Sequence, residues 1–228
     1  MEKGKAERIA LMSGWLAHQP PAFQAAVLGQ ARRASFAKGE TVFHDQGGVY
    51  GVVQGGVAVF VPGRGATLRL GHFGRAGFWF GHWPVMTGRR AVLTFRAAEP
   101  TVALHVSFSA LNEIARQDGA WARSVGSLMD FTVDLALTAV GDLLIPDSDR
   151  RLAATMLRAA GLDQDQRPSK PIGLRLTPSE LGEMANVAGP VASRILARFE
   201  AAGWVVLDHD HLAIANPRAL AAFAAEGA

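Results

Sequence analysis

The chain has 228 residues, of which 49% are apolar, and this supply of apolar residues favours packed cores in two modest domains over extensive disorder. It contains no cysteine, which excludes disulfides, thiolate zinc sites, Cys-ligated iron–sulfur clusters and cysteine nucleophiles. The net charge of +3 permits a polyanionic partner without identifying one. Neither a signal-peptide core nor a run of about 18 apolar residues occurs, so we expect a cytoplasmic protein that binds no membrane.

The first part of the chain predicts a β-domain with a helical cover. Residues 6–32 are expected to form two short helices that are broken at Pro20-Pro21. From Ser35 to about Ser107, short runs of Val, Phe, Leu and Thr are separated by glycines. Short strands with glycine turns at this spacing are typical of an antiparallel sandwich or barrel.

The segment from about Ser109 to Leu144 contains no proline and predicts a short helix followed by a long one. Two apolar stripes run along the long helix at a spacing of three to four residues. The first stripe consists of Met129, Val133, Ala136, Val140 and Leu144, and the second of Trp121, Val125, Leu128 and Leu135. One stripe can cover the β-domain while the other meets a second copy of the chain, which predicts a two-fold homodimer. The alternative is a helix buried within one monomer.

A domain boundary is predicted at residues 145–149. Pro146 disfavours helix at the residue before it, and Asp147 or Ser148 can cap the helix that follows. Beyond the boundary we expect a helix over 151–160, a polar loop over 164–171 and a short strand over 174–176.

The next segment predicts two helices joined by a sharp turn. Thr177-Pro178-Ser179-Glu180 is a capping box, in which the Thr177 hydroxyl accepts from the N–H of Glu180 and Glu180 reaches back. This helix is expected to end near Asn186, and Gly189-Pro190 starts a second helix that continues to Ala202. The expected core between the helices consists of Leu181, Met184, Val187, Ala192, Ile195, Leu196 and Phe199. Gly203 ends the second helix, and strands over 204–207 and 211–214 complete a winged helix-turn-helix.

This order of parts resembles the Crp/Fnr family of bacterial transcription regulators over about residues 36–220. In the β-domain the resemblance rests on Phe36-x-x-Gly39-Glu40-x-x-Phe43, Tyr50-x-Val52-x-x-Gly55-x-Val57 and Gly74-x-x-Gly77-x-x-Phe80-Gly81. In the C-terminal part it rests on Leu176-Thr177-x-x-Glu180-Leu181, Ser193-Arg194-x-Leu196 and Phe199-Glu200-x-x-Gly203.

The resemblance implies an α+β protein in three parts. These parts are a jelly-roll-like β-roll that senses a signal (1–117), a long dimerisation helix (118–145) and a winged helix-turn-helix that binds DNA (146–228). It further implies a sequence-specific transcription regulator, not an enzyme, whose partners are a pseudo-palindromic operator in double-stranded DNA and RNA polymerase.

The resemblance places Arg194 at the family's recognition-helix arginine, where a guanidinium can donate two parallel hydrogen bonds to guanine O6 and N7. Ser193 beside it resembles the Ser-Arg pair of the Fnr branch, and Arg198, one turn on, is expected to contact a phosphate or to be simply exposed. The other predicted DNA-binding residues are Thr177, Ser179, Gly189 and Pro190. Most members carry an acidic base-reading residue where this chain has Pro190, so its specificity is expected to differ from the usual half-site or to depend on backbone contacts and DNA deformability.

An effector pocket is predicted around Phe80, Gly81, His82, Trp83, Arg89 and Arg90. Cyclic-nucleotide-binding members of the family use a Gly-Glu pair for the ribose and Arg-Ser/Thr for the phosphate. Here the first pair is Gly81-His82, and the two arginines are followed by apolar residues instead of a hydroxyl. Cyclic AMP is therefore not the expected effector. The aromatic residues of this segment fit a simple core, with an apolar or planar ligand as the alternative; haem is one such ligand, because some members bind it and histidine is a common axial ligand.

Other classes of function fit the sequence less well. A cupin-type enzyme could use His44, His72, His82 or His105 as metal ligands, but residues 35–107 lack the close His-x-His pair, and no Gly-x-Ser-x-Gly elbow occurs. The acidic and histidine residues at 208–211 are expected to form a solvated turn near DNA phosphates rather than a nickel or zinc site. The remaining alternative is a regulatory protein-interaction module whose helix-turn-helix has degenerated at Gly189-Pro190.

Overall fold

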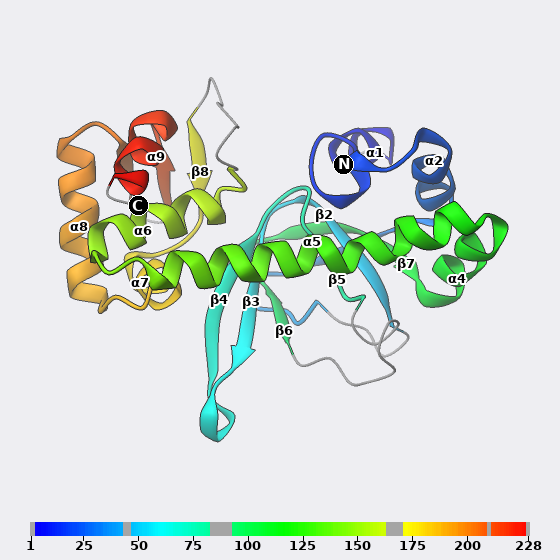
Figure 1. Ribbon diagram of the computed structural model, residues 1–228, viewed down its shortest axis with the longest axis horizontal. Helices are drawn as coiled ribbons and strands as arrows, with labels where there is room; N and C mark the ends of the chain where they lie inside the picture. The colour runs from blue at the N-terminus through cyan, green and yellow to red at the C-terminus, as the bar shows by residue number, and fades with distance from the viewer. Residues whose placement is uncertain (1–2, 43–46, 83–92, 163–170, 209–210, 227–228) are drawn as a thin grey trace. The chain divides into compact units, whose positions relative to one another are not determined.

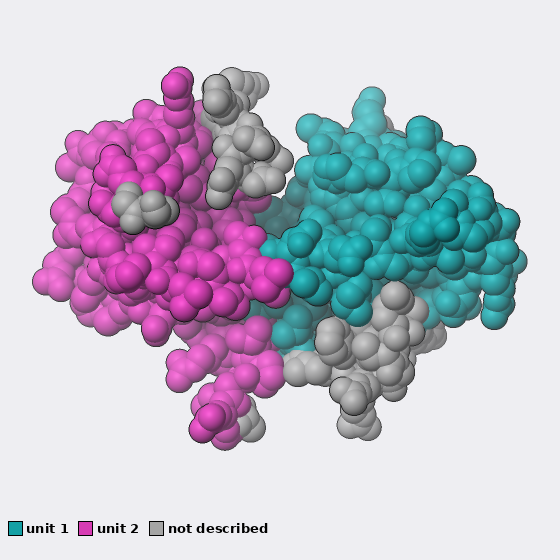
Figure 2. Space-filling view, in the orientation of Figure 1, with its two compact units in different colours: residues 1–59, 74–135 teal, residues 60–73, 136–228 magenta. Residues whose placement is uncertain are grey.

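The computed structural model describes residues 3–42, 47–82, 93–162, 171–208 and 211–226 (Figure 1). The chain separates into two compact units, residues 1–59 with 74–135 and residues 60–73 with 136–228, which Figure 2 shows in different colours. Among the described residues, no helix is both long enough and apolar enough to cross a membrane.

The N-terminal part of the chain begins with helices and continues into antiparallel strands. Its helical cover consists of α1 (Lys3–Ala10), a 3-10 turn (Trp15–His18) and α2 (Pro21–Gln30). One antiparallel sheet, with the order β1-β7-β2-β5, consists of β1 (Arg32–Phe36), β2 (Gly48–Gln54), β5 (Trp79–Phe80) and β7 (Thr101–Ser107). A second sheet, with the order β4-β3-β6, consists of β3 (Val57–Pro62), β4 (Leu68–Gly74) and β6 (Thr94–Ala97). The mixed α+β fold with an antiparallel β-domain is therefore confirmed.

The step from the helical cover to the first strand comes earlier than predicted. Helix was expected up to residue 32, whereas α2 ends at Gln30 and β1 begins at Arg32. Ala31 already has an extended backbone, with φ −72° and ψ 136°. From Arg32 onward β1 pairs with β7, Arg32 opposite His105. This long-range pairing decides the boundary, and no local pattern in the sequence encodes it.

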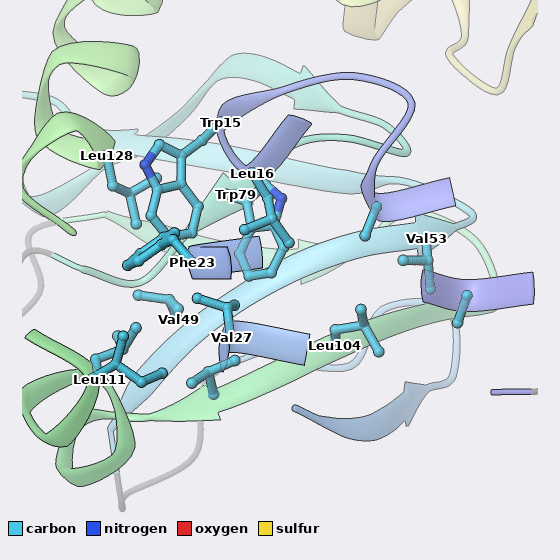
Figure 3. Packing of buried hydrophobic residues seen from close by; sticks show 14 residues of the cluster. Trp15, Leu16, Phe23, Val27, Val49, Val53, Trp79, Leu104, Leu111 and Leu128 are labelled. Carbon is cyan, nitrogen blue, oxygen red and sulfur yellow. The ribbon is translucent and has the colours of Figure 1, made fainter. Parts of the chain in front are cut away.

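The helical cover packs on the sheet through aromatic residues (Figure 3). Trp15 meets Phe23 and Trp79 edge to face, with ring centroids 5.8 and 5.3 Å apart. Its indole Nε1 donates a hydrogen bond of 3.0 Å to the carbonyl oxygen of Ser124 on the long helix. Leu128, on the same helix, is fully buried in this cluster. One apolar stripe of the long helix therefore covers the β-domain, as the sequence predicted.

The long helix is α5 (Gly119–Leu144), preceded by the short α4 (Phe108–Gln117). Its other apolar stripe is exposed: Val133 is 46% exposed, Leu137 63%, Val140 52% and Leu144 74%. These residues are spaced four, three and four apart, the alternation that brings side chains to one seam of a coiled coil. The sequence prediction included three of them and missed Leu137.

Candidate nucleic-acid interface

The C-terminal residues fold as a winged helix-turn-helix. Its helices are α6 (Ser148–Ala159), α7 (Pro178–Met184), α8 (Gly189–Ala201) and α9 (Pro217–Ala225). Its antiparallel sheet, with the order β8-β10-β9, consists of β8 (Ile172–Leu174), β9 (Val205–Asp208) and β10 (His211–Ile214). The two helices and the hairpin predicted from the sequence are thus present and adjoin one another in the chain.

The strand before α7 lies two residues earlier than predicted. It was expected over 174–176, whereas β8 ends at Leu174, which pairs with Leu212 of β10. Leu176 is buried without being part of a strand. A buried leucine just before a helix cap resembles a strand residue in sequence, and the register of a distant partner strand makes the distinction.

Local chemistry fixes the start of α7 and the turn after it. The Thr177 Oγ1 accepts from the N–H of Glu180 at 3.2 Å, and Glu180 Oε2 accepts from the N–H of Thr177 at 2.7 Å, so the predicted capping box is formed. Asn186 has a φ of 51°, the left-handed conformation expected at the turn. The predicted shared core of α7 and α8 is also confirmed, with Leu181, Ile195 and Phe199 buried.

The two helices approach most closely at Gly182, which sequence reasoning missed. A β-carbon placed there would lie 2.6 Å from the carbonyl oxygen of Val187 and 3.2 Å from the β-carbon of Ala192. The first distance is shorter than van der Waals contact permits, and backbone rather than a flexible side chain would have to move. Only glycine therefore allows α7 and α8 to pack at this separation.

Gly182→Ala is expected to destabilise the protein by about 1–3 kcal/mol, because the added methyl group overpacks the helix-turn-helix. Urea unfolding measures this change. The matched control is Gly29→Ala in α2, where no atom lies within 4 Å of an added β-carbon and the substitution is expected to be neutral or stabilising. Equal stability of Gly182→Ala and the wild type would contradict the close approach.

The outer face of α8 carries the predicted base-reading residues. Ser193, Arg194 and Arg198 are all exposed. The Ser193 hydroxyl donates to the carbonyl oxygen of Gly189 at 3.1 Å, within the helix. Arg198 forms an ion pair with Asp149 of α6. Within the described part of the chain the Arg194 guanidinium has no such partner, so its donors remain available to another molecule.

The remaining predicted DNA contacts lie at the starts of α7 and α8. Thr177, Ser179 and Pro190 are exposed. A β-carbon on Gly189 would lie 3.6 Å from the Ser179 Oγ, which places Ser179 beside the beginning of α8. That helix has no side-chain cap and no acidic residue in its first turn. The positive end of its dipole is therefore not neutralised locally and favours an anion such as a phosphate.

The predicted effector residues are described only in part. Phe80 is buried and stacks with Tyr50, Phe78 and Phe95, with ring centroids 5.6, 5.4 and 4.4 Å away. His82 is 7% exposed, and its two ring nitrogens have no hydrogen-bond partner among the described residues. Burial lowers the pKa of His82, which keeps the imidazole neutral. Gly81, between them, has a φ of 94°.

Trp83, Arg89 and Arg90 lie outside the described residues, so the effector pocket stays a prediction. His44, one of the alternative metal ligands, also lies outside them. Within the described residues, no group of three histidine or carboxylate side chains could hold a metal ion.

Two arginines of α6, one buried and one partly buried, bind groups elsewhere in the chain, which the sequence did not reveal. Arg151 donates through Nε to the carbonyl oxygen of Ala185 at 2.7 Å and through Nη1 to that of Pro146 at 3.1 Å, so it joins the end of α7 to the segment after α5. Arg158 is 6% exposed and pairs with Asp142 near the end of α5, with 2.6 Å between Nε and Oδ2. Charged residues in an amphipathic helix are usually solvated, so only the tertiary fold shows that these two are not.

Part of the sequence matches a known protein family, and the fold resembles several solved structures. Residues 150–223 match the family model of the Crp-like helix-turn-helix domain. No curated protein matches the chain. The structure of FixK2 from Bradyrhizobium japonicum resembles it with a TM-score of 0.72 and 21% identity, over 87% of this chain and 99% of that one. A candidate cyclic nucleotide binding protein from Ruegeria pomeroyi does so with a TM-score of 0.71 and 18% identity, over 98% and 99%.

A transcriptional regulator of the CRP/FNR family from Thermus thermophilus is also similar, with a TM-score of 0.62 and 14% identity, over 85% of this chain and 98% of that one. Residues 150–223 are thus similar to the Crp-like helix-turn-helix domain. The whole chain has the fold of the Crp/Fnr regulators, and the resemblance inferred from its sequence is confirmed.

Proposed function

We propose that this protein is a homodimeric, sequence-specific transcription regulator of the Crp/Fnr type that acts in the cytoplasm and carries out no enzymatic reaction. Residues 146–228 bind the operator, residues 118–145 dimerise and residues 1–117 sense a signal. One observation carries the proposal above all others: Arg194 is exposed and unpartnered within the described residues, on the second helix of a Crp-like helix-turn-helix. A guanidinium in that position can read guanine in the major groove.

The exposed seam of α5 supports the homodimer. Four large apolar side chains at alternating spacings of four and three residues are costly to leave in water, and a second copy of the same helix covers them. A two-fold dimer presents two recognition helices, which fits a pseudo-palindromic operator in double-stranded DNA. RNA polymerase is the further partner that a regulator of this type requires.

The proposed signal is not cyclic AMP. His82 takes the place of the ribose-binding glutamate of cyclic-nucleotide-binding members, and burial keeps this histidine neutral. A neutral, buried imidazole suits an apolar or planar effector better than a hydroxyl-rich sugar. Iron–sulfur chemistry through cysteine is excluded because the chain has none. The alternative to DNA binding, a regulatory protein-interaction module, is favoured by one observation, the Gly189-Pro190 start of α8.

Binding to random duplex DNA at increasing salt tests the proposal against this alternative. The logarithm of the binding constant is expected to fall linearly with the logarithm of salt concentration, by about 0.9 for each phosphate neutralised. Fluorescence anisotropy between about 50 and 200 mM salt measures the slope. A protein-only module gives no such slope. Selection from genomic fragments is then expected to yield half-sites about one helical turn apart.

A further inference from the structure

Strand β4 is contacted by side chains of the helix-turn-helix domain. The N–H of Leu70 donates a hydrogen bond of 2.9 Å to Glu183 Oε1 of α7. The carbonyl oxygen of Gly71 accepts from Arg158 Nη1 of α6 at 3.2 Å. Both contacts lie within one compact unit, which contains residues 60–73 and 136–228 (Figure 2). Residues 60–73, which include most of β4, thus group with the domain that carries the proposed recognition helix.

β4 lies at an edge of its sheet, in the order β4-β3-β6. The outer side of an edge strand presents backbone groups that no strand pairs, and proteins commonly cover such edges. Here Glu183 accepts from the N–H of Leu70, and Arg158 donates to the carbonyl oxygen of Gly71. The helix-turn-helix domain therefore contacts the backbone of β4 at two successive residues.

Arg158 also connects the strand to the long helix. Its Nε pairs with Asp142 of α5, and its Nη1 lies 3.1 Å from His72 Nδ1 of β4. Burial, and then the charge of Arg158, lower the pKa of His72 to about 3, so the ring is neutral at physiological pH and its Nδ1 can accept from the guanidinium. One side chain of α6 thus reaches both α5 and β4.

The hydrogen-bond network around Arg158 leaves one buried donor without a partner among the described residues. The Arg158 Nη2 is buried and has no hydrogen-bond partner among the described residues. Burial raises the pKa of Asp142 despite the opposing hydrogen bond and charge of Arg158. Desolvating these charges offsets much of their attraction, so a buried pair of this kind contributes little net stability.

We propose that Glu183 and Arg158 form a releasable latch between β4 and the helix-turn-helix domain, and that opening the latch changes the affinity for DNA. The strand belongs to the sheet of the proposed sensor, and the latch residues sit on the two helices that support α8. A shift of β4 would break both contacts and free the helix-turn-helix domain to move. The inference has two halves. The first, that Glu183 and Arg158 hold β4, concerns the free protein. Only the second, that opening the latch changes the affinity for DNA, rests on the proposed function.

Amide hydrogen exchange on the full-length protein without DNA tests the first half. Glu183→Ala is expected to speed exchange of the Leu70 amide between about threefold and tenfold, the range that loss of one hydrogen bond produces. Glu183→Gln keeps an oxygen acceptor and should restore much of the protection. Arg158→Met should also speed exchange across β4, whereas Arg150→Met, on the same helix but paired with Glu226, should not.

Glu183 is exposed, so its variants should fold, and unchanged exchange of Leu70 in Glu183→Ala would refute the latch. Exchange that rises equally at Leu181 and Ile195 in this variant would mean general destabilisation and would also refute it. Affinity for a selected operator tests the second half: Glu183→Ala and Arg158→Met should shift the dissociation constant in the same direction, with Arg150→Met unchanged. Faster exchange at β4 without such a shift overturns the coupling alone, and a wild type that binds no DNA overturns the proposed function instead.

Discussion

Arg194→Ala is expected to weaken binding to the selected operator by about 1–3 kcal/mol for each half-site and to relax the preference at one base pair. The substitution would delete the two parallel hydrogen bonds that Arg194 is proposed to donate to guanine. It leaves the fold intact, because Arg194 is exposed and has no partner among the described residues. Anisotropy titrations on the operator, and on the same duplex with that base pair replaced, measure both effects.

Arg198→Ala is the matched control, one turn further along α8. Arg198 is exposed and pairs with Asp149 on the protein itself, so any contact with DNA is expected to be with phosphate. Its removal should weaken all sequences alike and lower the salt slope by about one. A folded Arg194→Ala variant with unchanged affinity and unchanged preference would show that α8 is not a recognition helix, and the protein-interaction alternative would then be preferred.

Replacing Val133 and Val140 together with glutamate is expected to convert the proposed dimer to monomers. Both side chains are about half exposed in the isolated chain and lie on the seam of α5, so dimerisation would bury four uncompensated charges across the two copies. Sedimentation velocity measures the change in mass.

Met12→Glu controls for the loss of an exposed apolar side chain elsewhere, since Met12 is exposed and lies outside α5. It should remain dimeric. A dimer of undiminished stability in the double variant would remove α5 as the interface while leaving the helix-turn-helix assignment untouched.

The parts of the fold that were predictable from sequence depend on local chemistry. The capping box at Thr177 and the left-handed Asn186 are determined within four residues, and the sequence predicted both. Apolar periodicity likewise predicted that one of the two stripes of the long helix covers the β-domain, and the structure shows that it is the stripe containing Leu128. Leu137 was missed because a stripe drawn through Ala136 fits the helical period almost as well as the exposed stripe that contains Leu137.

The parts that were not predictable depend on residues far apart in the chain. The boundaries of β1 and β8 follow from their partner strands, as the Leu174–Leu212 pair shows. In the sequence, Gly182 looks like a glycine that merely lowers the stability of a short helix. Its role is visible only in the fold, where the carbonyl oxygen of Val187 lies beside it. For the candidate site, the prediction of Arg194 came from the resemblance to a family. The pairing of Arg198 with Asp149 needed the fold.

The grouping of residues 60–73 with the C-terminal part of the chain has a consequence for synthesis on the ribosome. The Leu70 amide and its Glu183 acceptor are separated by 113 residues. Translation proceeds at about 5–20 residues per second, so β4 emerges many seconds before its covering side chains exist. During that interval the strand edge can pair with another nascent chain, and the exposed Val61 and Leu68 of the same hairpin add to the hazard. A chaperone that binds the hairpin early would protect this edge until the C-terminal part of the chain has been made.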